Sequence, residues 1–316
     1  MNDARTLRIA NLFPRIRLFL ALSRTPHGLL DMATPALCAL LWLGEFPPAK
    51  IIVLGIVTAF AGYTSVYALN DVVDYRRDKD KINKGLLDET DTSMDAVLVR
   101  HPMAQGLLKY WEGFIWMVSW AVLAVVGAYI LNPVCVLIFV IGFSVEIIYC
   151  ALFSFSWSRT VVSCMVKTSG AIAAVFAVDS NPSPYFLVVL FLMLSFWEVG
   201  GQNIPNDYID ANEDKVLKGT SIPLSLGTKN ASVAIFYSIL AVTLLSLVIH
   251  RFTPNRAGIF FMVAFVLAGL YLLLIPAIRL LKSKKRAHAI ALFNKASWYP
   301  FVLFIIVTVR LISELV

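Results

Sequence analysis

Charged residues and cysteines are scarce in this chain. Aspartate, glutamate, lysine and arginine together make up only 15% of its 316 residues, whereas an average soluble domain has about 25%. This shortage excludes an ordinary soluble globular protein. The cysteines show no paired spacing and all fall within long apolar runs, so neither a disulfide framework nor a zinc site is indicated. They are Cys38, Cys135, Cys150 and Cys164.

Apolar residues, by contrast, fill 59% of the chain, and the mean hydropathy is +0.77. Several apolar runs are long enough to cross a bilayer as helices. They lie at 27–44, 51–69, 111–131, 134–153, 160–178, 184–202, 231–249, 257–275 and 296–315. The sequence therefore predicts an all-α integral membrane protein with nine transmembrane helices, in which residues 27–316 form a single transmembrane domain.

Residues 1–26 have a different character. Their arginines alternate with apolar residues, and the segment lacks the continuous apolar core and the cleavage site of a signal peptide. We expect an amphipathic helix that lies on the inner leaflet of the membrane.

The basic residues are distributed unevenly among the expected loops. They concentrate in the N-terminal segment and after the second, fourth, sixth and eighth expected helices, while the opposite loops carry only Lys50, Arg251 and Arg256. The positive-inside rule then predicts a cytoplasmic N-terminus. The formal charge of +7 would lie beside anionic headgroups and phosphorylated substrates, and it implies no nucleic-acid partner.

One acidic pattern occurs twice in the chain. It consists of an Asn-Asp pair followed by aspartates three and seven positions after the first aspartate. The two copies comprise Asn70, Asp71, Asp74 and Asp78, and Asn206, Asp207, Asp210 and Asp214. On a helix this spacing places the three carboxylates of each copy on one face. Because such close carboxylates repel one another, we expect a bound cation, and Mg²⁺ is the hard ion that best suits oxygen ligands near phosphates.

Each acidic copy directly follows an apolar run, at the expected cytoplasmic end of the second or the sixth helix. These are equivalent positions four helices apart. We therefore expect the helices to surround a central cavity in which the two carboxylate faces meet, with the site on the cytoplasmic side.

With these motifs in place, the chain resembles the UbiA superfamily of intramembrane prenyltransferases, whose members have nine transmembrane helices and acidic motifs after helices two and six. Arg24 with Pro26, and the stretch KGTSIPLSLG at 218–227, add to the resemblance. It implies that a polyprenyl diphosphate binds through two Mg²⁺ ions held by the six aspartates of the two motifs. The prenyl group would pass to a small hydrophobic or aromatic acceptor, in the inner membrane of a bacterial or archaeal cell.

The resemblance also implies roles for other residues. Tyr149, Arg77 and Lys167 are the expected catalytic residues, Tyr149 because its aromatic face can stabilise an allylic cation. The expected diphosphate-binding residues are Asn70, Arg76, Lys79, Arg159, Asn206, Lys215 and Lys218. Further aromatic residues near the expected cytoplasmic helix ends are Tyr63, Tyr67, Phe153, Trp197 and Tyr208.

The chain departs from the family pattern after the first motif. Tyr75 stands where members have an arginine, and Arg100-His101-Pro102 follows only after an extra acidic stretch, LLDETDTSMD, at 86–95. That stretch is either a lid over the site or, as the stronger interpretation, a solvated loop.

Each assignment has a simpler alternative. The aspartates can be solvated helix caps, and Lys79 and Lys215 can be topology signals. Lys167 and Glu146 lie within expected spans, where ionisable groups are functional candidates, although the two can also pair with each other. Glu198 is a candidate for a residue near the metal or for acceptor binding.

Two questions of function stay open at this point. A secondary transporter would also carry membrane-embedded acids, but its ion site should lie near the bilayer midplane. For the acceptor, an aromatic lipoquinone precursor is the first candidate. The alternative is a non-aromatic or tetrapyrrole acceptor, such as haem, a chlorophyll-type ring, or a glycerol or sugar phosphate.

Overall fold

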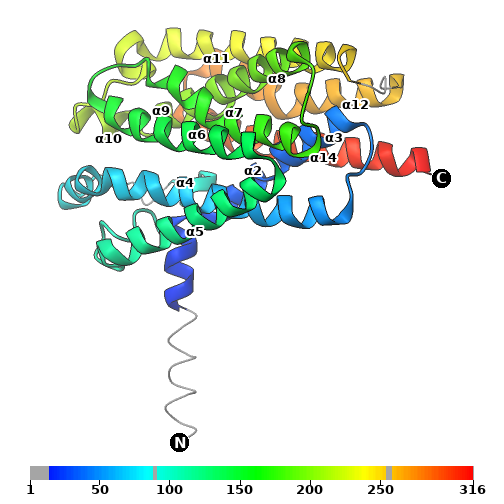
Figure 1. The fold of residues 1–316 in the computed structure, drawn as a ribbon. Coiled ribbons are helices and arrows are strands. Elements are labelled where there is room, and N and C mark those ends of the chain that lie inside the picture. Colours follow the sequence, from blue (N-terminus) through cyan, green and yellow to red (C-terminus); the bar gives the residue numbers. More distant parts are fainter. Residues whose placement is uncertain (1–13, 88–90, 254–257, 316) are drawn as a thin grey trace, which may run out of the picture.

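The computed structural model describes residues 14–87, 91–253 and 258–315, and within these ranges the chain is helical, without strands. Eight of the described helices are long and apolar enough to cross a membrane. Figure 1 shows the helices packed in one bundle, with α4 and α5 on one side and α11 and α12 on the other. The prediction of an all-α integral membrane protein is confirmed.

The eight candidate spans include several that are built from consecutive helical segments. They are α4 (Ala49–Asn83), α5 (Tyr110–Leu131), α6 with η2 (Pro133–Ala151, Leu152–Ser154), α7 (Arg159–Val178), α8 with η3 and α9 (Pro184–Trp197, Glu198–Asn203, Ile204–Ile209), α11 with η4 (Ile222–Val248, Ile249–Arg251), α12 with η5 and α13 (Ile259–Gly269, Leu270–Leu274, Ile275–Ser283) and α14 (Arg286–Leu315). The shorter helices are α2 (Thr25–Asp31), α3 (Ala33–Leu43), η1 (Met94–Ala96) and α10 (Ala211–Val216).

The ninth expected span, at 27–44, is divided between α2 and α3, which have 7 and 11 residues. Pro35 explains the division, because it lacks the N–H that would donate to the carbonyl of Asp31 four residues earlier. Neither part alone is long enough to count as a span, so among the described residues the structure shows eight spans rather than nine.

The predicted amphipathic segment lies only partly within the described residues. Its residues 14–22 form a helix, and Arg15 in this helix forms an ion pair with Glu112 at the start of α5. The cytoplasmic location of the N-terminus and the division of the chain at residue 26 remain predictions.

Helix α4 is longer than a bilayer requires. Its 35 residues, at 1.5 Å each, extend roughly 52 Å, whereas the hydrocarbon core of a bilayer is about 30 Å thick. The C-terminal part of α4, which carries Asp71, Asp74 and Asp78, therefore extends beyond the apolar part of the span.

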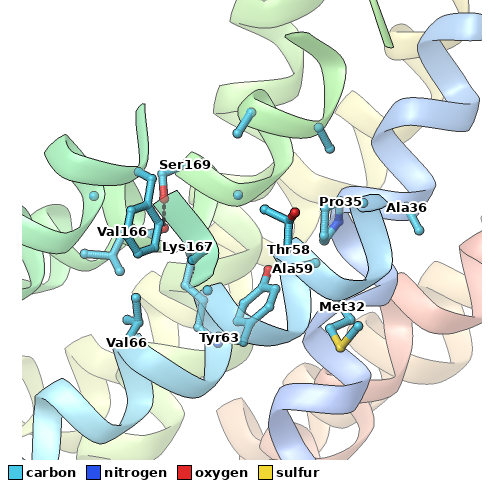
Figure 2. Close-up of a pocket in the computed structure, with 18 of the residues that line it drawn as sticks. Met32, Pro35, Ala36, Thr58, Ala59, Tyr63, Val66, Val166, Lys167 and Ser169 are labelled. Carbon is cyan, nitrogen blue, oxygen red and sulfur yellow. Dashed lines mark hydrogen bonds between the residues drawn. The ribbon is translucent and has the colours of Figure 1, made fainter. Parts of the chain in front are cut away.

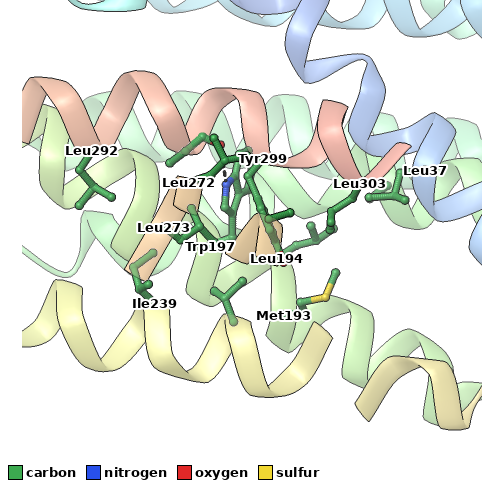
Figure 3. Close-up of a cluster of buried hydrophobic side chains, with 14 of the residues drawn as sticks. Leu37, Met193, Leu194, Trp197, Ile239, Leu272, Leu273, Leu292, Tyr299 and Leu303 are labelled. Atoms are coloured by element: carbon green, nitrogen blue, oxygen red, sulfur yellow. Dashed lines mark hydrogen bonds between the residues drawn. The ribbon is translucent and has the colours of Figure 1, made fainter. Parts of the chain in front are cut away.

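The main core lies between α3, α8, α11, η5 and α14 and is centred on Trp197 (Figure 3). The indole N–H of Trp197 donates to the carbonyl of Ala296 at 3.0 Å, so the buried ring keeps its hydrogen bond. Leu194, Ile239 and Leu273 are also buried in this cluster. Close packing of this kind holds helices together in a lipid environment, and it fixes the end of α8 where the next segment begins.

That next segment, η3, is a π-helix over Glu198–Asn203. The N–H of Ile204 donates to the carbonyl of Val199, five residues back, and the following Pro205 has no N–H to donate to Gly201. Gly200 and Gly201 allow close approach of neighbouring helices. A Cβ on Gly200 would lie 2.7 Å from Cβ of Ser238, and one on Gly201 would lie 2.9 Å from Cβ of Ala296.

Candidate active site

The two acidic motifs line one cavity of about 120 Å³. Asp71, Asp74 and Asp78 lie on α4, Asp207 lies on α9, Asp214 lies on α10, and Asp210 stands between these two short helices. All six predicted metal ligands are therefore brought together in space, although the motifs are more than 120 residues apart in the sequence.

The two motifs have different backbone conformations. The first follows one face of the continuous helix α4, as its spacing predicts. The second does not form one helix, because Asp210, with φ −89° and ψ 2°, separates α9 from α10. The expectation of a single helical face is thus correct for the first motif and wrong for the second.

Carboxylates outnumber cationic side chains around this cavity. Its described lining contains eight aspartates, against five lysine or arginine residues and His101. Asp207 Oδ2 and Asp210 Oδ1 are buried and accept no hydrogen bond from the described residues. Burial, together with the neighbouring carboxylates of Asp210 and Asp207, raises the pKa of Asp214 to about 7. Crowded carboxylate oxygens with free lone pairs are the donor set that fits Mg²⁺.

Cationic groups already approach the first motif. Arg24 donates to Asn70 Oδ1 at 3.2 Å and lies 3.4 Å from Asp71 Oδ1. His101 Nδ1 lies 3.0 Å from Asp78 Oδ2 and 3.5 Å from Asp71 Oδ1. Burial lowers the pKa of His101, but Asp78 and Asp71 outweigh this effect and raise it to about 8. Arg77 forms an ion pair with the remaining aspartate of the motif, Asp74.

Arg159, at the start of α7, is the corresponding cation of the second motif. It forms an ion pair with Asp207 and lies 3.6 Å from Asp214 Oδ2. Its guanidinium also lies 4.9 Å from the ring centre of Phe153, while that of Arg77 lies 3.9 Å from the same ring. Phe153 therefore holds Arg77, which lies within the first motif, and Arg159, which pairs with the second, beside the cavity through cation–π contacts.

Sequence reasoning assigned no role to three residues that connect the two motifs. Lys81 forms a buried ion pair with Glu213. Arg100 lies 3.5 Å from Asp210 Oδ1 and 3.6 Å from Glu213 Oε2. Lys81 follows Asp78 by three residues, so the sequence could have predicted that Lys81 lies on the same face of α4 as the aspartates. The contacts of Arg100 depend on long-range packing that no local pattern shows.

Residues 91–95 of the acidic stretch after α4 pack over the cavity. Ser93 and Asp95 line the cavity, and Asp95 pairs with His27 and Arg24. Burial opposes this charge, but His27 and Arg24 hold the pKa of Asp95 below its ordinary value. The backbone N–H of Met94 donates to Asn294 Oδ1 on α14 at 2.8 Å. These residues therefore form a cover, and the solvated-loop interpretation is wrong for them.

Several residues expected to bind diphosphate lie elsewhere. Arg76, Lys79, Lys215 and Lys218 are exposed and are absent from the described lining of the cavity. Asn70, Arg77, Asn206 and Arg159 do line it. The roles of both groups remain predictions.

A second, larger cavity of about 490 Å³ continues from the first into the membrane. Arg24, Asn70, Asp95, Tyr149 and Asn206 line both cavities and mark their junction. Small residues on α4 and α7, such as Gly55, Gly62 and Gly170, leave room between these helices. Figure 2 shows part of this lining, with Tyr63 from α4 and Lys167 from α7. We call the two spaces the acidic cavity and the apolar cavity.

Two predicted functional residues lie in the apolar cavity but not in the way expected. Lys167 does not pair with Glu146. Its ammonium group donates to Asp31 Oδ2 at 2.6 Å and to the Tyr67 hydroxyl at 3.1 Å. Glu146 instead accepts a hydrogen bond of 2.9 Å from Asn70.

The fold is that of a helical membrane protein in which a carboxylate-rich cavity adjoins a larger apolar one. The model of the UbiA prenyltransferase family matches residues 32–305. The chain therefore belongs to this family and is a prenyltransferase, as the motif resemblance predicts.

Solved structures support the fold. A UbiA homologue from Aeropyrum pernix K1, in its apo form, matches with a TM-score of 0.70 and 16% identity, over 92% of this chain and 98% of the homologue. A structure of digeranylgeranylglyceryl phosphate synthase matches with a TM-score of 0.66 and 17% identity, over 95% and 99% of the two chains. A UbiA homologue from Archaeoglobus fulgidus bound to DMAPP and Mg²⁺ matches with a TM-score of 0.65 and 13% identity, over 92% and 99%. No curated protein matches the chain significantly.

Proposed function

We propose that this protein catalyses Mg²⁺-dependent transfer of a polyprenyl group from a polyprenyl diphosphate to a small acceptor, an aromatic lipoquinone precursor being the first candidate. The observation that carries the proposal is the junction of the acidic cavity, lined by both aspartate motifs, with the apolar cavity. The Archaeoglobus fulgidus homologue with the same fold was solved with DMAPP and Mg²⁺.

The acidic cavity is the proposed diphosphate and metal site. Asp71, Asp74 and Asp78 would hold one Mg²⁺, and Asp207, Asp210 and Asp214 would hold the second. Bound there, the metal supplies charge neutralisation for the departing diphosphate. Two observations support this assignment. The aspartates outnumber the cations of the described lining, and the buried Asp207 Oδ2 accepts no hydrogen bond from the described residues.

Arg77 and Arg159 are the proposed direct contacts to the diphosphate. Both line the acidic cavity, and their stacking on Phe153 restricts the directions in which they can donate. Charge-assisted donors held in this way stabilise the charge that develops on the leaving group. Asn70 and Asn206 stand at the junction of the cavities. Arg76, Lys79, Lys215 and Lys218 would reach the diphosphate only after their exposed side chains rearrange.

Tyr149 is the proposed wall beside the reacting carbon. It lines both cavities, and its hydroxyl accepts a hydrogen bond of 3.2 Å from Asn203. The aromatic face at the junction can stabilise an allylic cation where water is excluded. Lys167, the third predicted catalytic residue, lies deeper in the apolar cavity with its charge balanced by Asp31. We therefore assign it to the cavity wall.

The apolar cavity is the proposed site of the prenyl tail. Its lining along α4 runs from Ile51 to Asn70, which at 1.5 Å per residue is roughly 28 Å. That length is close to the hydrocarbon thickness of a bilayer, about 30 Å. A long prenyl chain would thus lie between α4 and α7 with its diphosphate at the cytoplasmic surface, in the inner membrane of a bacterial or archaeal cell.

The test is release of diphosphate from geranylgeranyl diphosphate by the purified protein in nanodiscs, with and without Mg²⁺, across a panel of aromatic and non-aromatic acceptors. Asp71→Asn and Asp207→Asn should each lower the rate by about 100-fold or more, because each removes a ligand charge from the site. Asp80→Asn is the matched control, since Asp80 is exposed on the same helix and does not line the acidic cavity. Release that is independent of Mg²⁺, or equal rates in all three variants, would overturn the proposal. The alternative of a secondary transporter would then be tested.

A further inference from the structure

The π-helix η3 places two incompletely satisfied polar side chains on the apolar cavity. Glu198 and Asn203 are its first and last residues, they are 4% and 7% exposed, and both line the cavity. Glu198 Oε2 and Asn203 Oδ1 are buried without a hydrogen-bond partner among the described residues. Buried polar atoms are normally paired, so two orphaned acceptors in one wall indicate a missing donor.

Each side chain forms one hydrogen bond with the described residues, through one of its two polar atoms. The second polar atom has no partner among these residues. The Ser163 hydroxyl on α7 donates to Glu198 Oε1 at 2.6 Å. The Asn203 amide donates to the Tyr149 hydroxyl at 3.2 Å, which directs its nitrogen toward α6 and leaves Oδ1 without a donor. The π-helical turn brings the first and sixth positions of the segment to the same side, and such turns are frequent at functional sites.

The location of the pair suits the second substrate. Tyr149, the partner of Asn203, lies at the junction of the acidic and apolar cavities, where the allylic carbon of a bound prenyl diphosphate would lie. Aromatic side chains of Tyr63 and Phe293 line the same cavity. A molecule held by Glu198 and Asn203 would therefore be next to the reacting carbon.

The charges around this wall disfavour an anionic molecule. The described lining of the apolar cavity contains the carboxylates Asp95, Glu146 and Glu198, and the cationic side chains Arg24 and Lys167. Both cations already contact carboxylates: Arg24 contacts Asp95, and Lys167 contacts Asp31. A carboxylate or phosphate on the ligand would add a like charge in a poorly solvated space without gaining an uncommitted cation.

We propose that Glu198 and Asn203 form the acceptor subsite, and that the acceptor is an uncharged, hydroxyl-bearing molecule whose hydroxyl groups donate to these two side chains. This inference rests on the proposed prenyl transfer. It selects phenols, hydroquinones and alcohols, and it disfavours acceptors that carry a free carboxylate or phosphate.

The experiment measures binding of three naphthalene probes to the full-length protein in nanodiscs, with Mg²⁺ and the slowly reacting analogue geranylgeranyl thiolodiphosphate. The probes are 1,4-dihydroxynaphthalene, its 2-carboxylate, and 1,4-dimethoxynaphthalene, which has no donor. We expect the dihydroxy probe to bind at least 10-fold more tightly than either of the others, because a site built around buried acceptors discriminates strongly against a ligand that lacks donors.

Substitutions of Glu198 and Asn203 test whether these two side chains determine the preference for the dihydroxy probe. Glu198→Leu and Asn203→Leu should remove most of the advantage of the dihydroxy probe over the dimethoxy probe. Glu198→Gln keeps an acceptor but removes the charge, so it should retain that advantage and improve binding of the 2-carboxylate several-fold. Glu45→Gln is the control for the loss of a carboxylate, because Glu45 is exposed and does not line the apolar cavity. Thermal unfolding shows whether each variant is folded.

Equal binding of all three probes, tighter binding of the 2-carboxylate, binding of none, or probe preferences unchanged by Glu198→Leu would each overturn the inference. Mg²⁺-dependent binding of the thiolodiphosphate, measured separately, distinguishes the two proposals. If the thiolodiphosphate binds but the probe preferences fail, the subsite is wrong and the proposed function stands. If the thiolodiphosphate itself does not bind, the proposed function is wrong as well.

Discussion

The two acidic motifs share one sequence pattern but have different structures and different electrostatic surroundings. The first lies on a single long helix, where Arg24, His101 and Arg77 approach its carboxylates. The second is divided at Asp210 between two short helices, where Arg159 approaches Asp207 and Asp214 and Arg100 approaches Asp210. Its buried Asp207 Oδ2 accepts no hydrogen bond from the described residues.

Among the described residues, three cations approach the three aspartates of the first motif and two approach those of the second, so we expect the second motif to depend more on an added cation. Two copies of one sequence pattern can therefore differ in their electrostatic energy. Phe153 and the Lys81–Glu213 pair connect the two motifs, so their different behaviours should be separable by substitution.

The largest expected effect comes from the arginines on the two sides of Phe153. Arg159→Met should lower the rate of diphosphate release about 100- to 1000-fold, because it removes a diphosphate donor and the cation beside both Asp207 and Asp214. Arg77→Met should have a smaller effect, because Arg77 contacts only one of the aspartates, Asp74, among the described ion pairs. Steady-state rates at saturating Mg²⁺ provide the comparison. An equal or larger loss for Arg77→Met would contradict the assignment of the stronger role to Arg159.

The next effect concerns the ion pair that joins the motifs. Lys81 and Glu213 are both nearly buried, with side chains 7% exposed. Lys81→Met leaves the buried Glu213 carboxylate with the more distant Arg100 at 3.6 Å, and Glu213→Gln removes the ion-pair partner of the buried Lys81, so each should destabilise the fold by about 3 kcal/mol. Thermal unfolding in detergent measures the loss.

The double variant should lose less than the sum of the two single variants, because it leaves neither charge unpaired. Strictly additive losses would show that the two side chains do not interact in the folded protein.

A smaller effect should appear in the protein without metal. Asp210→Asn relieves repulsion among Asp207, Asp210 and Asp214, and we expect this gain to exceed the loss of the 3.5 Å contact with Arg100. The variant should therefore have a higher unfolding temperature in EDTA and a smaller increase with Mg²⁺. Asp74→Asn weakens the ion pair of Arg77 and should lower the unfolding temperature in EDTA. Each change corresponds to about 1 kcal/mol. The same direction of change for both variants would remove the proposed distinction between the motifs.

Local sequence patterns predicted the parts of the molecule that depend on local geometry. The spacing of Asp71, Asp74 and Asp78 predicted their common face because α4 is one uninterrupted helix. Pro35 accounts for the division between α2 and α3 by an equally local effect, because its missing N–H acts within a single turn. The apolar runs predicted the eight spans because their length and hydropathy depend on consecutive residues.

The remaining features depend on contacts between distant segments. The pairing of Lys167 with Asp31, the Lys81–Glu213 pair and the cover formed by residues 91–95 each join residues far apart in the sequence. The break at Asp210 has no glycine or proline at that position to signal it. Glu198 was identifiable as an ionisable residue in an apolar run, but its orphaned oxygen became apparent only after the surrounding helices were placed.

The most direct test of the account is an experimental structure of the protein with Mn²⁺ and geranylgeranyl thiolodiphosphate, in which anomalous scattering locates the metal ions. We expect two metal ions in the acidic cavity, one beside Asp71, Asp74 and Asp78 and one beside the second motif, with the prenyl chain between α4 and α7. Metal ions outside the acidic cavity, or a prenyl chain outside the apolar cavity, would contradict it.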